Sequence, residues 1–420
     1  MLSLFKQNKM YRMFLMYRFF SAIGGAMFSM FILLAVHLIY ENPVYTGVAG
    51  FLMAAPRIFS FAVGPIVDRR NKITIMRLTT LLEFLVLSLL AFSPLLDSLG
   101  VAFMFAVIFV YNIAALFESP ASTALLPQIV PEEKILEANS LIEIVAMAGG
   151  IAIGTVLFIS LGGDVNFRFL FGFSAVFLAA TFVFSLLIKN PAPKESVIKS
   201  PSHKYMTDLK EGAKFIRRNI LLYITLAVVA MDFFGEISYV NRPMFLEYHV
   251  GAQGYIVFTL MGLIGGIASS YFVGMMGNKF KLGRLIFALF MLAGMVRVAF
   301  ALVVPVQYVG GLITIAIYIA LANSLDIVFS SLNQKIPPKD MVGRVNTIST
   351  TFVAIAVTAG ALIGGFLGSI VPVVDHIFIY QGISYALIGV LIICVPSIRK
   401  LPKMNDIGGG SDSSEDAVTP

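Results

Sequence analysis

The sequence is dominated by twelve long apolar runs, and these decide the class of protein. Each run is long enough to cross about 30 Å of hydrocarbon as a helix that rises about 1.5 Å per residue. Helix is the expected form, because lipid offers no partner to an unpaired backbone group. The runs lie near residues 13–39, 45–67, 74–94, 99–118, 140–162, 166–188, 219–240, 254–277, 284–306, 308–332, 345–371 and 376–397. The chain is therefore predicted to be an all-α integral membrane protein with twelve transmembrane helices.

Composition supports this class and excludes several others. Hydrophobic residues make up 58% of the chain and charged residues 13%, against roughly 45–50% and about 25% in ordinary globular chains. Those values exclude a soluble multidomain enzyme and a disordered chain. The single cysteine, Cys394, allows neither an internal disulfide nor a thiolate metal site. The histidines are far apart and no glycine-rich phosphate loop precedes a lysine, so we expect no metal and no cofactor.

The basic residues predict how the chain is oriented. With the N-terminus inside, the inward-facing segments hold 24 of the 30 lysines and arginines, whereas the outward-facing loops hold only Arg168 and Arg242. An excess of basic residues marks the cytoplasmic side. We therefore expect a multi-pass protein of the plasma (inner) membrane with both termini in the cytoplasm. The net charge of +7 is assigned to inward-facing loops, and no nucleic-acid partner is expected.

A long polar stretch divides the chain into two similar halves. We predict an N-terminal six-helix bundle, a cytoplasmic linker with an amphipathic helix, a C-terminal six-helix bundle and a disordered cytoplasmic tail, over residues 1–188, 189–218, 219–400 and 401–420. The halves share short patterns: Gln128 to Pro131 recurs as Gln334 to Pro337, Gly150 and Gly154 recur as Gly360 and Gly364, and Gly64 recurs as Gly274. Such internal symmetry is typical of secondary transporters whose halves move about a central site.

The loop after the second span carries the most specific pattern. It reads Gly64-Pro65-Ile66-Val67-Asp68-Arg69-Arg70-Asn71-Lys72 and resembles the signature of the major facilitator superfamily: a glycine, an aspartate four residues later and a basic cluster. Gly64 would let another helix approach closely, and Asp68 would cap a neighbouring helix or pair with arginine. Asn71 stands where the family has a second glycine, and we expect it to tolerate similar backbone angles.

The resemblance also implies a gate on the cytoplasmic side. Its residues would be Gly64, Asp68, Arg69 and Lys72, with Glu118 at the cytoplasmic end of the fourth span completing a charge cluster with Asp68 and Arg69. In the second half the motif decays to Gly274 followed by Asn278, so the aspartate is missing.

Within that superfamily the chain is similar to the macrolide-efflux-type branch of twelve-span drug exporters. The resembling stretches are 117–121 running on to 130–133, 336–338 running on to 343–345, and more weakly 209–212 with the span that follows. The sequence also departs from the pattern of drug–proton antiporters at two positions. Tyr111, followed by Asn112, occupies the place of their arginine in span four, and span five lacks the proline of their glycine–proline signature.

Ionisable residues inside apolar runs are costly and mark sites or interior pairs. Asp232 and Glu236 are spaced i, i+4 on span seven and share one face. Two carboxyl groups so close repel, and such a pair can bind and release a proton. Phe234 lies beside them and could hold an organic cation. The alternative is that these carboxylates pair with Arg57 or Arg297 inside the bundle.

Other intramembrane polar residues are weaker candidates. Asp326, with Asn323 one turn earlier, lies on span ten, which the resemblance places at the cavity with spans one, four and seven. Arg57 follows Pro56 in mid-span and must face protein or water. Glu83 and Arg297 lie on spans three and nine, which the resemblance places at the periphery, so buried structural ion pairs are expected for both.

These patterns favour proton-coupled export of small amphipathic compounds by alternating access, as in a drug antiporter that gives multidrug resistance. The partners would be a small-molecule substrate, protons and the lipid bilayer, and we expect a monomer. One alternative is an exporter of a polar or zwitterionic metabolite such as a siderophore or metallophore, which the intramembrane charges of both signs favour. An uptake permease and a membrane receptor or enzyme are further alternatives, and the sequence leaves the direction of transport open.

Overall fold

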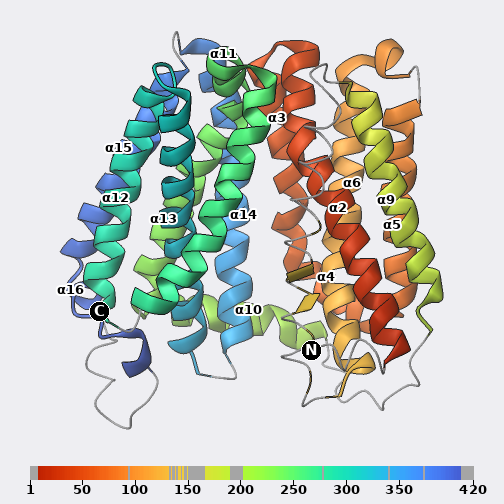
Figure 1. The fold of residues 1–420 in the computed structure, drawn as a ribbon. Coiled ribbons are helices and arrows are strands. Elements are labelled where there is room, and N and C mark those ends of the chain that lie inside the picture. Colours follow the sequence, from red (N-terminus) through yellow and green to blue (C-terminus); the bar gives the residue numbers. More distant parts are fainter. Residues whose placement is uncertain are drawn as a thin grey trace. The chain divides into compact units, whose positions relative to one another are not determined.

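A computed structural model describes the chain in two compact units, residues 1–198 and 199–420, each considered by itself below (Figure 1). The described residues are 8–92, 95–131, 134, 138, 141, 142, 144, 145, 149, 166–189, 202–276, 279–338, 341–371 and 374–407. Within them, eleven helical segments are long and apolar enough to cross a membrane. They match eleven of the twelve predicted spans. The remaining predicted span, 140–162, lies largely outside the described residues.

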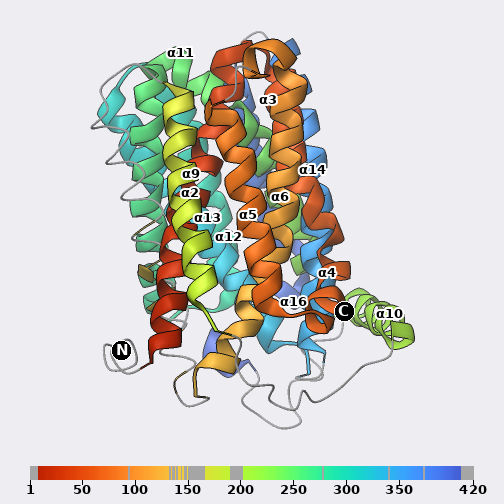
Figure 2. The ribbon, with the colours of Figure 1, turned by 90° about the vertical axis from the view of Figure 1, so that its right-hand side faces the viewer.

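The first unit is built from five long helical segments. They are α2 (Lys9–Tyr40), α3 (Pro43–Ala54) continued by η1 (Ala55–Phe59) and α4 (Ser60–Arg69), α5 (Lys72–Phe92), α6 (Leu95–Ile129) and α9 (Phe167–Leu187). Helix α9 packs against both α2 and α5, and α5 packs against α6; Figure 2 shows α9 running beside α2. At one end of this unit a cluster of apolar side chains is fully buried, including Tyr11, Tyr17, Phe14 and Met76.

The second span of this unit is interrupted where proline enters it. Pro56 lies in the first turn of η1, and the chain runs there as a 3-10 helix before the α-helix resumes at Ser60. Proline has no N–H to donate to the preceding turn, so a tighter local helix is a common result. The interruption leaves the side chain of Arg57 exposed.

Asparagine begins several of these helices. Asn8, Asn42 and Asn166 accept hydrogen bonds from backbone N–H groups in the first turns of α2, α3 and α9. The side chain of Asn71 does the same for α5, accepting from the N–H groups of Ile73 (2.9 Å) and Thr74 (3.2 Å). Of the non-glycine residues that the structure describes, only Glu41 has a positive φ. Asn71 is thus a helix N-cap with a negative φ, so the tolerance for glycine-like backbone angles expected of it is not used here.

The second unit contains three short elements besides its six predicted spans, namely α10, α16 and η4. Its helices are α10 (Ser202–Arg217), α11 (Leu221–Met276), α12 (Leu282–Val303), α13 (Tyr308–Lys335), α14 (Val342–Ile370), α15 (Asp375–Cys394) and α16 (Pro396–Arg399), followed by the 3-10 turn η4 (Met404–Asp406). Helix α11 holds two spans, Leu221–Gly251 and Gly254–Val273. Between them Gly251 has φ +74°, a conformation that glycine adopts without steric cost.

Glycines set how closely the helices of this unit approach. A Cβ added to Gly360 of α14 would lie 2.6 Å from the carbonyl oxygen of Phe233, and one added to Gly364 would lie 2.8 Å from the Cα of Ile237, both on α11. A Cβ on Gly294 of α12 would lie 2.5 Å from the carbonyl oxygen of Gly382 on α15. Small residues at helix contacts allow this close packing in membrane proteins.

The linker helix and the start of the tail both pack on the second unit. Glu211 of α10 forms an ion pair with Arg344 at the start of α14 (2.6 Å), and Gly212 abuts Arg344 and Ile348; α10 lies beside that end of α14 in Figure 1. Lys335 donates to the carbonyl oxygen of Met404 (2.8 Å). Residues 401–407 therefore differ from the disordered tail predicted for 401–420, and residues 408–420 lie outside the described part.

Candidate functional site

The second unit brings together two acidic residues from different spans. Asp232 is half-buried on α11, and Asp326 is exposed on α13. Asp326 interacts electrostatically with Asp232, and the hydroxyl of Tyr385 on α15 interacts with both carboxyl groups. The sequence spacing had paired Asp232 with Glu236. Asp326 is thus a partner of Asp232 that the spacing along span seven does not predict, and the pairing of Asp232 with Glu236 stays a prediction.

Glu236 lies in a different electrostatic environment, although it shares a helix with Asp232. It interacts with Arg242, further along α11. The guanidinium of Arg242 stacks 4.9 Å from the ring of Tyr239 and 5.4 Å from that of Tyr255. A carboxylate and an arginine so placed stabilise each other's charge.

Phe234 packs edge-to-face on Phe233, with ring centroids 5.3 Å apart. The two rings therefore lie on the helix segment between Asp232 and Glu236, as the sequence implies.

Arg297 of α12 is buried without a carboxylate beside it among the described residues. Its Nε donates to Oε1 of Gln381 (2.5 Å) and its Nη2 to Oγ of Ser238 (3.2 Å). Aromatic rings enclose the guanidinium at 4.4 to 5.0 Å, namely those of Tyr318, Phe378 and Phe300. The expectation of a buried ion pair at Arg297 is therefore corrected: an amide, a hydroxyl and π faces take the place of an acid.

The hydrogen bonds continue from Arg297 towards Asp232. Gln381 donates through Nε2 to the hydroxyl of Tyr318 (2.8 Å), which donates to the hydroxyl of Tyr385 (3.4 Å). Tyr385 donates to the carbonyl oxygen of Met231 (3.3 Å). We call Arg297, Gln381, Tyr318 and Tyr385 the relay cluster. Sequence reasoning missed its last three members, and Gln381 and Tyr385, spaced i, i+4 in the final span, were the signal that could have indicated them.

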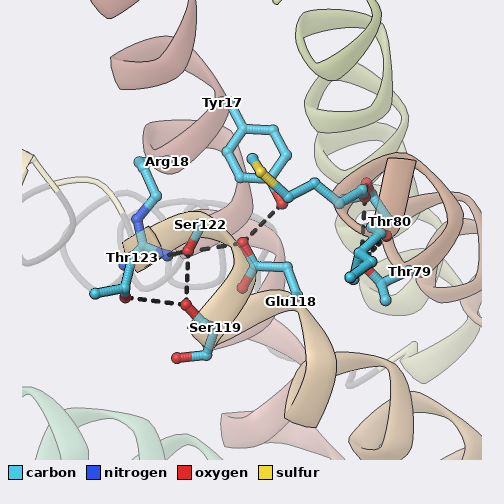
Figure 3. Close-up of polar contacts among 10 residues, drawn as sticks. Tyr17, Arg18, Thr79, Thr80, Glu118, Ser119, Ser122 and Thr123 are labelled. Carbon is cyan, nitrogen blue, oxygen red and sulfur yellow. Dashed lines mark hydrogen bonds and ion pairs between the residues drawn. The ribbon is translucent and has the colours of Figure 1, made fainter. Parts of the chain in front are cut away.

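The first unit holds a second polar cluster, around Glu118 of α6 (Figure 3). The hydroxyl of Tyr17 donates to Oε1 of Glu118 (2.7 Å), and Nη1 of Arg18 lies 3.7 Å from the same oxygen. Arg18 also donates to Oγ of Ser122, one turn further along α6 (3.3 Å). Both α2 residues were absent from the candidate set, although Tyr17 and Arg18 are adjacent polar residues within an apolar run.

Two further residues of the first unit lie close to Glu118. Glu83 of α5 is buried and interacts electrostatically with Glu118, and Tyr111 interacts with both carboxyl groups. The charged neighbour found for Glu83 is thus another acid, which differs from the structural ion pair expected. Tyr111 itself is buried and stacks on Phe28 with ring centroids 3.9 Å apart.

The other predicted residues have simpler environments. Asn112 donates to the carbonyl oxygen of Ile108 on its own helix (2.8 Å). Asn323 is half-buried, and its Nδ2 would lie 3.2 Å from a Cβ added to Gly266. Arg57 is exposed on η1. Neither asparagine is brought against Asp232 by a hydrogen bond among the residues that the structure describes.

The predicted gating motif is only partly described. Within the described residues a Cβ added to Gly64 would meet no atom within 4 Å, so the close helix approach expected there is not found. Lys72 is half-buried at the start of α5. The side chains of Asp68 and Arg69 lie outside the described part of the structure, and their cluster with Glu118 stays a prediction.

Comparisons with known proteins agree with this architecture. The family described as Major Facilitator Superfamily matches residues 14–361. Macrolide efflux protein A of Streptococcus pyogenes is 23% identical over 367 residues, which cover 84% of this chain and 86% of that protein. The crystal structure of the nucleoside transporter NupG superimposes on this chain with a TM-score of 0.73 at 12% identity, over 93% of this chain and 99% of that one.

A bacterial homologue of the iron transporter ferroportin, solved in an inward-facing state, gives a TM-score of 0.68 at 14% identity, over 92% of this chain and 98% of that one. At these identities the solved structures share the fold alone. The family match covers most of the chain, and the apolar helices make it a multi-pass membrane protein. The chain therefore belongs to the Major Facilitator Superfamily and is a transporter, not an enzyme.

Proposed function

We propose that this transporter exports small amphipathic compounds across the plasma membrane in exchange for protons. It works by alternating access, as a monomer with both termini in the cytoplasm. The observation that carries the proposal is that Asp232 and Asp326, from two different spans, lie near enough for each charge to influence the other. The similarity to macrolide efflux protein A supports drug-type efflux and a contribution to multidrug resistance.

The carboxyl pair can link proton binding to substrate binding. Ionisable residues inside transmembrane helices are costly to insert and are usually retained for function. Two interacting carboxyl groups titrate as a unit. A proton and an organic cation both neutralise the same negative charge, so each would displace the other. That competition is the physical requirement for an exchanger.

The surroundings of the pair suit a substrate with an apolar body. Phe233 and Phe234 follow Asp232 directly on α11, and Asp326 is exposed. Aromatic faces attract organic cations and cover apolar surface at the same time. An amphipathic cation would place its charge at the carboxyl pair and its apolar part on these rings.

A second candidate substrate class is a polar or zwitterionic metabolite of the siderophore or metallophore kind. The specific observation that favours it is Arg242, which lies on the same helix as Asp232 and interacts with Glu236. A segment that presents charges of both signs can bind both ends of a zwitterion. The two classes differ in whether Arg242 contributes to substrate affinity.

The test is transport in proteoliposomes with an imposed pH gradient, with lipophilic cations and zwitterionic metabolites compared as substrates. We expect the gradient to drive uphill movement of the cations, and Asp232→Asn to reduce this to the level seen without a gradient. Asp406→Asn, which neutralises an exposed carboxylate in η4, is the matched control.

Thermal stability of the same variants separates coupling from folding. Neutralising Asp232 lowers the cost of inserting α11, so the folded protein should persist. If Asp232 instead holds an arginine, its loss would strand that charge and lower stability. A folded Asp232→Asn variant with unchanged proton-driven transport would contradict the proposal. A dependence on Arg242 with zwitterionic substrates only would favour the second class.

A further inference from the structure

The hydrogen bonds of the relay cluster all have the same direction. Arg297 and Ser238 both donate to Oε1 of Gln381, so that oxygen is fully used as an acceptor and Nε2 must face Tyr318. Tyr318 accepts from Gln381 and donates to Tyr385, which donates to the carbonyl oxygen of Met231. Arginine has donors and no acceptor. The permanent cation therefore fixes the orientation of the Gln381 amide, which leaves the hydroxyl hydrogen of Tyr318 available to Tyr385.

The hydrogen bonds of the relay cluster end next to the carboxyl pair. Met231, whose carbonyl oxygen accepts from Tyr385 at 3.3 Å, immediately precedes Asp232. Tyr385 interacts electrostatically with Asp232 and with Asp326. Gly235 leaves room for this approach, since a Cβ there would lie 3.4 Å from the Tyr385 hydroxyl oxygen. The hydroxyl of Tyr385 thus donates to a neutral acceptor, the carbonyl of Met231, and has two ionisable acceptors nearby.

Close helix packing holds Arg297 and Gln381, at the other end of these hydrogen bonds, in place. Gly294 and Gly382 bring the backbones of α12 and α15 together, and Arg297 and Gln381 lie one turn and one residue from that contact. Arg297 is 3% exposed, and its Nη1 has no hydrogen-bond partner among the described residues. Burying a cation without an acid is expensive. The cost of burying Arg297 has a reason if its charge acts on the carboxyl pair through the hydrogen bonds of the relay cluster.

We propose that Tyr385 is a positioning residue for proton coupling, whose hydroxyl donates to Met231 when the Asp232–Asp326 pair is protonated and turns to the carboxylate when the pair loses a proton. This inference rests on the proposed function of that pair. Arg297, Gln381 and Tyr318 keep the Tyr385 donor available by holding the direction of the chain. The released proton leaves to water, and the tyrosines carry none of it.

Other charged groups of these helices are engaged elsewhere. Glu236 interacts with Arg242 on α11, and His249 at the end of the first span of α11 pairs with Asp375 at the start of α15 (2.7 Å). Arg344, the only charged residue of α14, pairs with Glu211. Among the described residues, Tyr385 and the two acids act on one another, and Arg242 is a second positive charge near Arg297.

The test is an infrared pH titration of the carboxyl band in the purified, reconstituted transporter, with Asp232→Asn and Asp326→Asn assigning the band. Tyr385→Phe removes the donor to the ionised form, so we expect the midpoint to move upward by about one pH unit. Tyr318→Phe leaves Tyr385 in place but removes the hydroxyl that donates to Tyr385. It should move the midpoint in the same direction by a smaller amount. Tyr380→Phe, on the exposed face of the same helix, is the matched control.

An unchanged midpoint in Tyr385→Phe, or an equal shift in Tyr380→Phe, would overturn the inference. If Tyr385→Phe fails to fold, Tyr318→Phe decides the question by the same criterion. The titration needs no transport, so it separates the two proposals. A shifted midpoint in Tyr385→Phe together with intact proton-driven transport in Asp232→Asn would support the role of Tyr385 and contradict the proposed function. An unchanged midpoint in Tyr385→Phe together with lost proton-driven transport in Asp232→Asn would contradict the role of Tyr385 and support the proposed function.

Discussion

Each unit has a polar cluster with two carboxyl groups, two tyrosines and one arginine, but the arginine stands in a different relation to the acids. In the first unit Arg18 lies 3.7 Å from Glu118 and its side chain is 27% exposed. In the second unit the fully enclosed Arg297 reaches the Asp232–Asp326 pair only through Gln381 and two tyrosines. The same kinds of residue therefore form a direct ion pair in one unit and a separated arrangement in the other.

That difference indicates different roles. A direct ion pair is a packing element, because removing either member leaves the other without its partner. A carboxyl pair without an arginine partner among the described residues can gain or lose a proton without leaving a cation unpaired there. We infer that the Glu118 cluster stabilises the first unit and that the second unit carries the coupling. The predictions below test that division.

The largest effect is expected from the loop motif, which only the first half retains. Asp68→Asn, which makes the motif resemble the second half at Asn278, should shift the balance between conformations and cut transport about tenfold while leaving expression intact. Transport rates in vesicles of equal protein content measure this. Asn278→Asp is the control and should change little. Wild-type turnover in Asp68→Asn would remove the gating role, whereas an equal loss in Glu118→Gln would support the cluster of Asp68, Arg69 and Glu118.

The next effect concerns how the relay cluster is held. Gly294→Ala places a Cβ 2.5 Å from the carbonyl oxygen of Gly382, so α12 and α15 must separate. Overpacking of this kind costs about 1–3 kcal/mol. We expect a lower thermal unfolding temperature and a weaker response of transport to pH. Gly343→Ala, where an added Cβ meets no described atom within 4 Å, should change neither. Equal stability in both variants would show that the close contact is not needed.

A smaller loss is expected from the direct ion pair. Glu118→Gln keeps an acceptor for Tyr17 but removes the charge opposite Arg18, and the partial exposure of Arg18 lets water replace some of the lost interaction. The expected cost is about 1–2 kcal/mol of unfolding free energy, measured by thermal unfolding of purified protein. Arg18→Gln should cost a similar amount. A stability gain in either variant would show that the pair is not a packing element.

The smallest effect is expected at the exposed pair between the linker helix and the second unit. Glu211 is 53% exposed where it pairs with Arg344, and such pairs contribute about 0.2–1 kcal/mol and weaken as salt screens them. Glu211→Gln should lower the unfolding temperature slightly at low salt and not at high salt. A salt-independent loss would mean that α10 is held by packing alone, as the contact of Gly212 with Ile348 allows.

Sequence patterns predicted the fold well because hydrocarbon thickness and backbone hydrogen bonding leave few choices. Run length gave the spans, and the repeated glycines at 360 and 364 fell at real helix contacts. Local chemistry was less readable. Asn71 is a residue type typical of turns but caps α5. Pro56 interrupts the second span with a short 3-10 helix, where Arg57 is exposed.

Sequence patterns indicated candidate residues but not the neighbours that these residues have in the structure. Helical spacing joins Asp232 to Glu236, yet Asp232 interacts with Asp326 on another helix, and Glu236 interacts with Arg242 further along its own helix. Which residues meet across helices depends on helix rotation and close approach, and a single sequence does not encode these as a local period. Arg297 illustrates this, since amide and aromatic partners from three other helices replace the acid that its charge suggested.

The division between the two units is tested most directly by one ratio, the rate of export with a pH gradient divided by the rate without it. It should be measured in the same proteoliposomes for wild type, Asp232→Asn and Glu118→Gln. We predict that Asp232→Asn lowers the ratio to one while downhill movement continues, and that Glu118→Gln keeps the wild-type ratio even where its absolute rate falls. A ratio of one in Glu118→Gln with a wild-type ratio in Asp232→Asn would contradict the assignment of coupling to the second unit.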